Sequence, residues 1–297
     1  MPAAYPQAFE AFVAPARQRP ELWRLGLGCV LAIAVYFAGI AVIFGAAYLI
    51  AGPEKSATLM ASLAKAETPA ATLILFLTFA GMALGPILAA RVMHKRGAGT
   101  LFGRTPVVLR HFVLAVAVAG AIYGVTVGGW FVMFDATPGL DLSVWLAFLP
   151  LTLAGLLLQT GAEELVFRGY LQQQLAARFR SPVMWMILPA VIFGLVHYDP
   201  LTAGDNLWLI IASVTLFALV AADLTVVTGS LGAAWGFHFV NNFFAVGFIA
   251  VEGTLPGLAL FVTPYAADDT GILRLLILAD LATMAIAWAV LRRILRR

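Results

Sequence analysis

The sequence predicts an all-α membrane protein, a polytopic bundle of about eight transmembrane helices with both termini in the cytoplasm. Three observations lead to this prediction: the composition, the long apolar runs and the placement of the basic residues. The 297 residues are 62% hydrophobic and only 11% charged, with a mean hydropathy of +0.97. A soluble domain carries about 25% charged residues, so the composition excludes the soluble class.

Eight apolar runs are candidates for membrane spans. A helix that crosses the hydrocarbon core needs about 20 apolar residues, because the helix rises about 1.5 Å per residue. Turn residues separate several of them; Thr228-Gly229-Ser230, for example, lies between the sixth run and the seventh. The fifth run is marginal in length. The predicted spans are residues 25–50, 69–91, 111–134, 144–164, 183–199, 206–228, 231–251 and 272–292.

The basic residues predict the orientation of these spans. With a cytoplasmic N-terminus, only Lys55, Lys65 and Arg274 of the 18 Lys and Arg residues fall outside the cytoplasmic segments. Cytoplasmic loops are enriched in Lys and Arg, so this asymmetry favours one orientation. We therefore expect an integral membrane protein with its N-terminus in the cytoplasm and with the first apolar run as an uncleaved anchor.

Three sets of polar residues interrupt the later apolar runs. Ionisable residues are costly in hydrocarbon, and as a rule they face a protein interior and act there. The lone cysteine, Cys29, excludes an intramolecular disulfide and a cysteine-based metal cluster. The three sets are Glu163, Glu164 and Arg168; then Phe193 and His197; then His238 and Asn242.

A helical hairpin brings the first two sets to a similar depth. The segment after Gly169 contains no helix breaker, so the fourth span is expected to continue to about residue 180 before the fifth begins at Pro182. Glu163 then lies about 17 residues from the turn on one arm, and His197 about 15 on the other. His238 and Asn242 are four residues apart and share one face of the seventh span.

Spacing separates the two carboxylates. Glu164 and Arg168 stand at i and i+4, which favours an ion pair, whereas Glu163 points elsewhere and has no partner in its own segment. An unpaired glutamate in an apolar cavity suits a general base or acid. We therefore predict that Glu163 transfers the proton, with Glu164, Arg168 and Phe193 supporting it.

The histidines and the asparagine suit hydrolysis by an activated water. His197 can orient the water activated by Glu163, or bind a metal ion as neutral imidazole. His238 and Asn242 can both donate hydrogen bonds to the oxyanion that forms when a carbonyl is attacked. A catalytic zinc held by His197 and His238 is one prediction and a site without a cofactor is the other, since no His-Glu-x-x-His helix is present.

The three motifs resemble those of the CAAX-protease and bacteriocin-processing (Abi) family of intramembrane proteases, which includes the eukaryotic type II CAAX prenyl endopeptidases. The matching residues are Glu163-Glu164-x-x-x-Arg168, Phe193-x-x-x-His197 and His238-x-x-x-Asn242. The resemblance implies a water activated by Glu163 and His197, with His238 and Asn242 as oxyanion stabilisers or as part of a metal site. It covers residues 144–251, between N-terminal helices in 1–143 and a C-terminal helix with a basic tail in 252–297.

Two other functions compete with an intramembrane endopeptidase. A transporter could use Glu163, His197, His238 and Asp280 as a proton relay, although no inverted repeat is visible. A non-catalytic immunity or scaffold protein is the third possibility. The expected partners are the lipid bilayer and a membrane-associated peptide or protein, and no nucleic acid. The roles of Asp223 and Asp280 and the oligomeric state stay open at this point.

Overall fold

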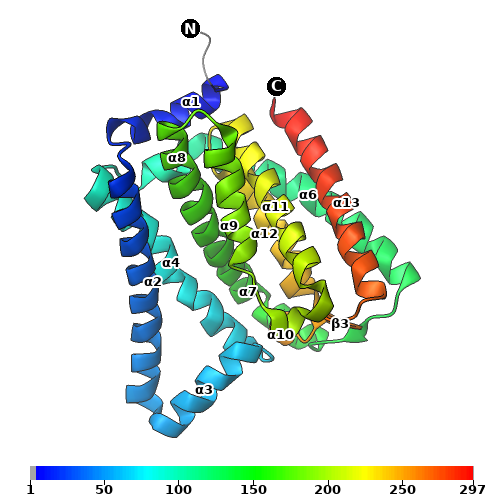
Figure 1. The fold of residues 1–297 in the computed structure, drawn as a ribbon. Coiled ribbons are helices and arrows are strands. Elements are labelled where there is room, and N and C mark those ends of the chain that lie inside the picture. Colours follow the sequence, from blue (N-terminus) through cyan, green and yellow to red (C-terminus); the bar gives the residue numbers. More distant parts are fainter. Residues whose placement is uncertain (1–4, 297) are drawn as a thin grey trace.

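A computed structural model describes residues 5–296 as a bundle of long helices with short connections (Figure 1). The helices are α1 (Gln7–Val13), α2 (Leu22–Ala51), α3 (Pro53–Lys65), α4 (Pro69–His94), α5 (Gly99–Phe102), α6 (Thr105–Met133), α7 (Leu142–Glu164), α8 (Gln173–Arg178), α9 (Leu188–Leu195), α10 (Pro200–Ala203), α11 (Leu207–Thr228), α12 (Gly232–Asn242) and α13 (Ile272–Leu295). Shorter 3₁₀ turns are η1 (Ala14–Gln18), η4 (Gly204–Asn206) and η6 (Pro256–Leu258), and π-helical turns are η2 (Leu165–Gln172), η3 (Val183–Ile187) and η5 (Phe243–Phe248).

The chain is an all-α polytopic membrane protein. Six helices of the described region are long and apolar enough to cross a membrane: Leu22–Ala51, Pro69–His94, Thr105–Met133, Leu142–Arg178, Pro200–Thr228 and Ile272–Leu295. Each coincides with one of the predicted spans. Figure 1 places α1 and the end of α13 at the same end of the bundle.

The predicted count of eight spans is not confirmed, because two of the predicted helices are short. The fifth predicted span corresponds to the apolar helix Val183–Leu195, and the seventh begins with α12, which has 11 residues. α12 continues through the six residues of η5 to Phe248, so the helix has 17 residues and covers about 25 Å at about 1.5 Å per residue, whereas the hydrocarbon core is about 30 Å thick. The predicted orientation of the termini stays a prediction.

The seventh predicted span ends early because its last residues leave the helix. After η5, residues Ile249–Glu252 form strand β2, which pairs in parallel with β3 (Phe261–Ala266). A two-residue strand, β1 (Thr137–Pro138), pairs antiparallel with β3 on its other side. This small sheet of order β1-β3-β2 was not predicted from hydropathy.

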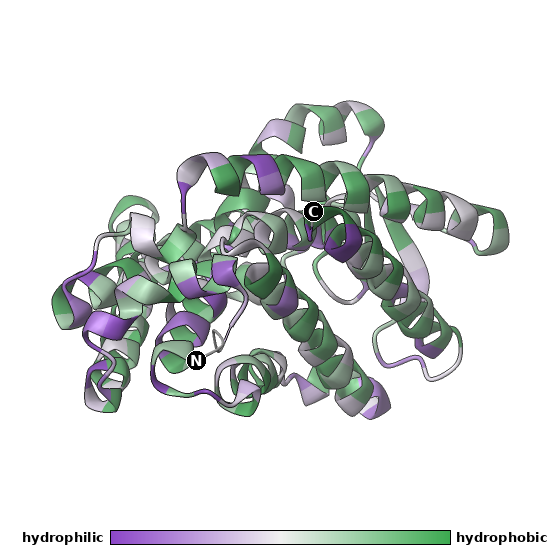
Figure 2. Cartoon of the chain, turned by 90° about the horizontal axis from the view of Figure 1, so that it is seen from above, coloured by the Kyte–Doolittle hydropathy of each residue, from purple (hydrophilic) through white to green (hydrophobic). Residues whose placement is uncertain are grey.

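Apolar side chains cover the outward faces of the long helices. Leu49 and Ile50 at the end of α2 are 85% and 86% exposed, an arrangement that water would disfavour and lipid accommodates. Figure 2 shows hydrophobic residues on all sides of the helices, whereas hydrophilic residues gather mainly at ends and connections. The bundle is therefore apolar outside as well as inside.

The hairpin predicted from the sequence is present. The helix from Leu142 runs without a break to Arg178 through α7, η2 and α8, and η3 with α9 returns beside it. The π-helical turn η2 begins directly after Glu164. Such wider turns are rare and frequently lie at functional sites.

Glycines allow α12 to pack closely along α6. At Gly236 an added Cβ would lie 2.5 Å from the backbone oxygen of Phe112, and at Gly232 it would collide with the backbone oxygen of Val108. A backbone oxygen within a helix cannot move aside easily. Glycine at these two positions therefore fixes where α12 places His238 and Asn242.

Candidate active site

The two adjacent glutamates lie at the end of α7, where every residue from 159 to 165 is buried. Glu164 is 0% exposed and Glu163 is 8% exposed. The ion pair predicted from the i,i+4 spacing is present, because Nη1 of Arg168 donates to Oε1 of Glu164 at 3.0 Å. Nη2 of Arg168 donates to the backbone oxygen of Ala218 at 3.1 Å, and the guanidinium lies over the Phe193 ring at 4.9 Å.

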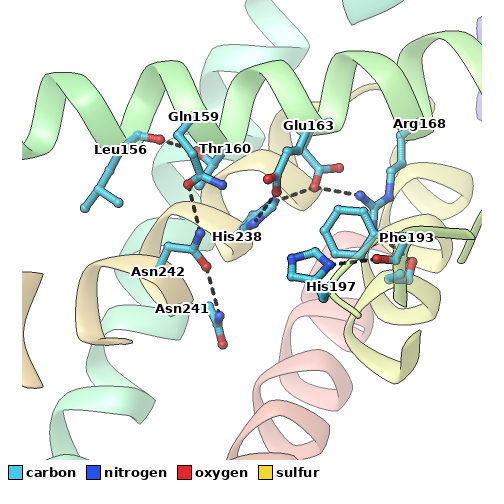
Figure 3. Close-up of polar contacts among 12 residues, drawn as sticks. Leu156, Gln159, Thr160, Glu163, Arg168, Phe193, His197, His238, Asn241 and Asn242 are labelled. Carbon is cyan, nitrogen blue, oxygen red and sulfur yellow. Dashed lines mark hydrogen bonds and ion pairs between the residues drawn. The ribbon is translucent and has the colours of Figure 1, made fainter. Parts of the chain in front are cut away.

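His238 joins the two carboxylates. Its Nδ1 lies 2.8 Å from Oε1 of Glu164, and its Nε2 lies 3.3 Å from Oε2 of Glu163 (Figure 3). The prediction that Glu163 is unpaired was therefore wrong. Its partner comes from α12, 75 residues away by number, and no spacing rule within α7 could reveal it.

The charges of this cluster can balance. Two ionised carboxylates both accept hydrogen bonds, so they fit a His238 ring that carries protons on both nitrogens. With Arg168 permanently charged, two negative and two positive groups then stand in one network. A balanced network of this kind avoids the large cost of an uncompensated buried charge.

His197 follows the last turn of α9, and its ring is fixed by the backbone. Its Nδ1 lies 2.8 Å from the carbonyl oxygen of Phe193. A carbonyl only accepts, so Nδ1 carries the proton and Nε2 of the neutral ring is left as an acceptor. Figure 3 shows this second nitrogen directed away from Phe193, toward the space between His238 and Asn242.

A chain of hydrogen bonds crosses the site from α6 to α7. The Tyr123 hydroxyl donates to Oδ1 of Asn241 at 2.9 Å, and Nδ2 of Asn241 donates to Oδ1 of Asn242 at 3.1 Å. Nδ2 of Asn242 then donates to Oε1 of Gln159 at 2.8 Å. An amide carries two N–H donors, so Asn242 retains one for another acceptor.

A single cavity of about 150 Å³ collects these groups. Glu163, His197, His238 and Asn242, the residues predicted to be catalytic, all line it. Of the predicted supporting residues, Phe193 is in the wall, whereas Glu164 and Arg168 lie behind it. The remaining lining residues are Gln159, Ser213, Val214, Phe217, Asn241, Asp280 and Met284.

Several residues that line the cavity were not predicted from the sequence. Gln159 stands one turn before Glu163, so helical spacing could have indicated it, and Asp280 was named only as a possible member of a proton relay. Asn241 was missed although it adjoins Asn242. Tyr123, which holds Asn241, gave no sequence signal because tyrosine is ordinary in an apolar helix. The last helix, placed outside the predicted core, contributes Asp280 and Met284.

The side chains do not fit a catalytic zinc site. Such a site takes three protein ligands and keeps one position open. Within residues 5–296 no group of three or more His, Cys, Asp or Glu side chains is arranged to hold a metal ion. Both ring nitrogens of His238 face carboxylates, and His197 has one nitrogen without a protein partner.

Comparison with known proteins places part of the chain in a family. The family model described as type II CAAX prenyl endopeptidase Rce1-like matches residues 141–244. Residues 141–244 are an Rce1-like domain. This confirms the resemblance identified from the three motifs. The Rce1-like domain contains Glu163, His197, His238 and Asn242, whereas Asp280 lies beyond its end.

One curated relative shares part of this region. The uncharacterized protein YyaK of Bacillus subtilis (strain 168) is 33% identical over 120 residues, which are 39% of this chain and 39% of the relative. The chain therefore matches well under half the length of that protein. No solved structure matches the chain.

Proposed function

We propose that the protein is an intramembrane endopeptidase that hydrolyses a peptide bond of a membrane-associated protein or peptide with a water activated by Glu163. The observation that carries the proposal is the meeting of Glu163, His197, His238 and Asn242 on one cavity inside an apolar bundle. Membership of residues 141–244 in a family of prenyl endopeptidases supports it.

Glu163 acts as the general base. It is the carboxylate of the cluster that lines the cavity, and a single contact, to Nε2 of His238 at 3.3 Å, holds it. A water between Glu163 and the free acceptor nitrogen of His197 gives one proton to Glu163, and its oxygen attacks the carbonyl carbon. The protonated Glu163 then donates this proton to the leaving amine as the C–N bond breaks.

His238 and Asn242 stabilise the oxyanion. Asn242 has one N–H left after its bond to Gln159. The Nε2 proton of His238 faces Glu163 at the start. When Glu163 takes a proton from water, its charge falls to zero, and the Nε2–H of His238, whose direction does not change, becomes available to a carbonyl oxygen that lies along it, where negative charge develops.

Glu164 and Arg168 position His238 without touching substrate. Glu164 holds Nδ1 of His238 at 2.8 Å, and Arg168 holds Glu164 at 3.0 Å. Both are almost fully buried, so the ring is oriented by fixed groups before substrate arrives. In this mechanism Glu163 moves the proton, and His238 and Asn242 supply the hydrogen bonds to the oxyanion.

We assign the site to the cytoplasmic side of a bacterial inner membrane, with both termini in the cytoplasm. The distribution of Lys and Arg along the sequence supports this assignment. Two short helices, Val183–Leu195 and α12, would then run within the bundle beside the six long ones. Accessibility of single cysteines introduced near Arg178 and near Lys55 would measure it.

The test is cleavage of a reporter membrane peptide by the purified protein in liposomes, with products identified by mass spectrometry. We expect cleavage by the wild type and none above background by Glu163→Ala or His197→Ala. Equal cleavage by wild type and both variants would refute these roles. Proton-gradient-dependent uptake without cleavage would favour a carrier, and full complementation of a deletion strain by Glu163→Ala would favour a non-catalytic protein.

A further inference from the structure

Asp280 stands where two cavities meet. It lines the catalytic cavity together with Glu163 and His197, and it also lines a second cavity of about 290 Å³. Ser213 and Asn241 are likewise shared by both linings. The two spaces are therefore neighbours, and a group bound in the second one would lie beside the first.

The second cavity is mostly apolar, although Thr126, Thr263 and Thr283 also line it. Its walls come from α6, η5, the small sheet and α13, and they include Trp130, Phe244 and Leu276. Asp280 is its one charged lining residue, and no Lys or Arg lines either cavity. Substrate groups that enter this space meet hydrocarbon walls and a carboxylate at the end nearest the reacting atoms.

Asp280 has no counterion within residues 5–296. The Tyr123 hydroxyl lies beside both the Asp280 carboxylate and Oδ1 of Asn241, so one neutral donor is shared between two acceptors. The Asp280 side chain is exposed to these cavities, and it lies in a helix that is long and apolar enough to cross a membrane. An ionisable side chain within a membrane span is costly, and as a rule it has a partner or lines a functional cavity. A cation brought by a ligand would remove this penalty.

We propose that Asp280 binds a cationic group of the substrate, a lysine or arginine side chain or a free amine, beside the scissile bond. The apolar cavity takes the aliphatic part of the same group. Lys and Arg side chains combine an apolar stem with a charged end, which matches a hydrocarbon cavity that ends in a carboxylate. This inference rests on the proposed peptidase function and adds a specificity that the family match does not carry.

The first experiment compares reporter peptides that differ only by lysine or norleucine, placed in turn at each position flanking the cleaved bond. At one position we expect the lysine peptide to be cleaved with a kcat/KM about tenfold higher, as a charged hydrogen bond would give, mainly through KM. Asp280→Asn should remove this preference, so that the variant cleaves the lysine and norleucine peptides with equal kcat/KM.

Two further variants separate specificity from structural damage. Asp280→Glu keeps the charge and should retain the preference for lysine. Asp141→Asn makes the same chemical change at an exposed aspartate before α7 and should behave as wild type. Equal cleavage of the lysine and norleucine peptides at every position by wild type would overturn the proposal, and so would a preference that survives Asp280→Asn.

The second experiment needs no catalysis. Thermal unfolding of the detergent-solubilised full chain is measured with n-hexylamine and with n-hexanol, which share an alkyl chain and differ in charge. We expect hexylamine to raise the midpoint more than hexanol in wild type, and the two to be equal in Asp280→Asn. Selectivity for hexylamine without any peptide cleavage would contradict the peptidase function and support the cation site. Peptide cleavage without selectivity for hexylamine would contradict only the cation site.

Discussion

Two carboxylate clusters in this bundle use the same kinds of side chain in different ways. Between α11 and α13, Asp223 accepts from Nε of Arg292 at 2.7 Å, from Nη2 of Arg292 at 3.1 Å and from Nε1 of Trp288 at 2.8 Å. The Trp288 ring also lies under the Arg292 guanidinium. This cluster is closed, since both oxygens of Asp223 have fixed partners.

The cluster of Glu163, Glu164, Arg168 and His238 is closed on one side and open on the other. Arg168 and His238 both contact Oε1 of Glu164, with Phe193 under the guanidinium, whereas Oε2 of Glu164 has no hydrogen-bond partner among the described residues. Glu163, however, has one contact at 3.3 Å and lines a cavity. The difference indicates that a fully paired charge ties two helices together, whereas a charge that faces a cavity is available for chemistry.

The largest expected effect separates the two clusters by activity. Glu163→Gln removes the base while keeping size and shape, so we expect kcat/KM to fall by about 10³-fold or more. Asp223→Asn, far from the reacting atoms, should leave kcat/KM within about twofold of wild type. The measurement is cleavage of a membrane reporter peptide in liposomes. A comparable loss of kcat/KM in both variants would contradict the different roles assigned to the two clusters.

The next effect concerns stability. Arg168→Met leaves Glu164 buried without its cation, and we expect the free energy of unfolding to fall by about 3–5 kcal/mol. Arg292→Met acts on a pair whose side chains are 30% and 15% exposed, so we expect a smaller loss, about 1–2 kcal/mol. Denaturant unfolding in detergent measures both.

A double variant sharpens this second test. Adding Glu164→Gln to Arg168→Met removes the uncompensated negative charge, so part of the lost stability should return. Catalysis should stay low, because His238 loses the carboxylate that orients Nδ1. Strictly additive losses in the double variant would contradict a coupled pair.

A smaller effect is expected at the open side of the site. Asn242→Ala deletes one predicted oxyanion donor, and we expect kcat to fall by about 10²-fold. The chain should stay folded, because the hydrogen bond that is lost, to Gln159, is partly exposed to the cavity. Steady-state kinetics test this, with Gln159→Ala as the matched control. An unchanged kcat in Asn242→Ala would remove it from the mechanism.

The smallest expected effect follows removal of metal ions. Both ring nitrogens of His238 face carboxylates, and within residues 5–296 no three donor side chains are arranged as a zinc site. We therefore expect dialysis against a chelator to change kcat/KM by less than about twofold. Even disturbing the groups around a functional metal typically costs about 10-fold to 100-fold. Loss of activity that zinc restores, with stoichiometric zinc in the purified protein, would contradict this expectation.

The local features of the fold and site were predictable from the sequence. The six long spans follow from apolar runs, because lipid contact demands apolar side chains all round a helix. The Glu164–Arg168 pair follows from helical spacing. The meeting of Glu163 with His197 follows from the hairpin, whose arms have nearly equal lengths.

The contacts between distant segments were not predictable. His238 reaches both glutamates because Gly232 and Gly236 let α12 approach α6 closely. The spacing of residues along the sequence does not show how closely two helices approach. Hydropathy also could not reveal that residues 249–252 leave the helix for a strand, since the run stays apolar. The sequence shows Asp280 as an acidic residue in an apolar run, but its position between two cavities depends on how α13 packs.

The most direct test of a water activated by Glu163 is a single turnover of the reporter peptide in oxygen-18 water. We predict that the new carboxyl terminus of the product carries one oxygen-18 atom after the first turnover, and that the Glu163 side chain carries none. Unlabelled product together with label in Glu163 would show direct attack by the carboxylate. That result would contradict the central claim.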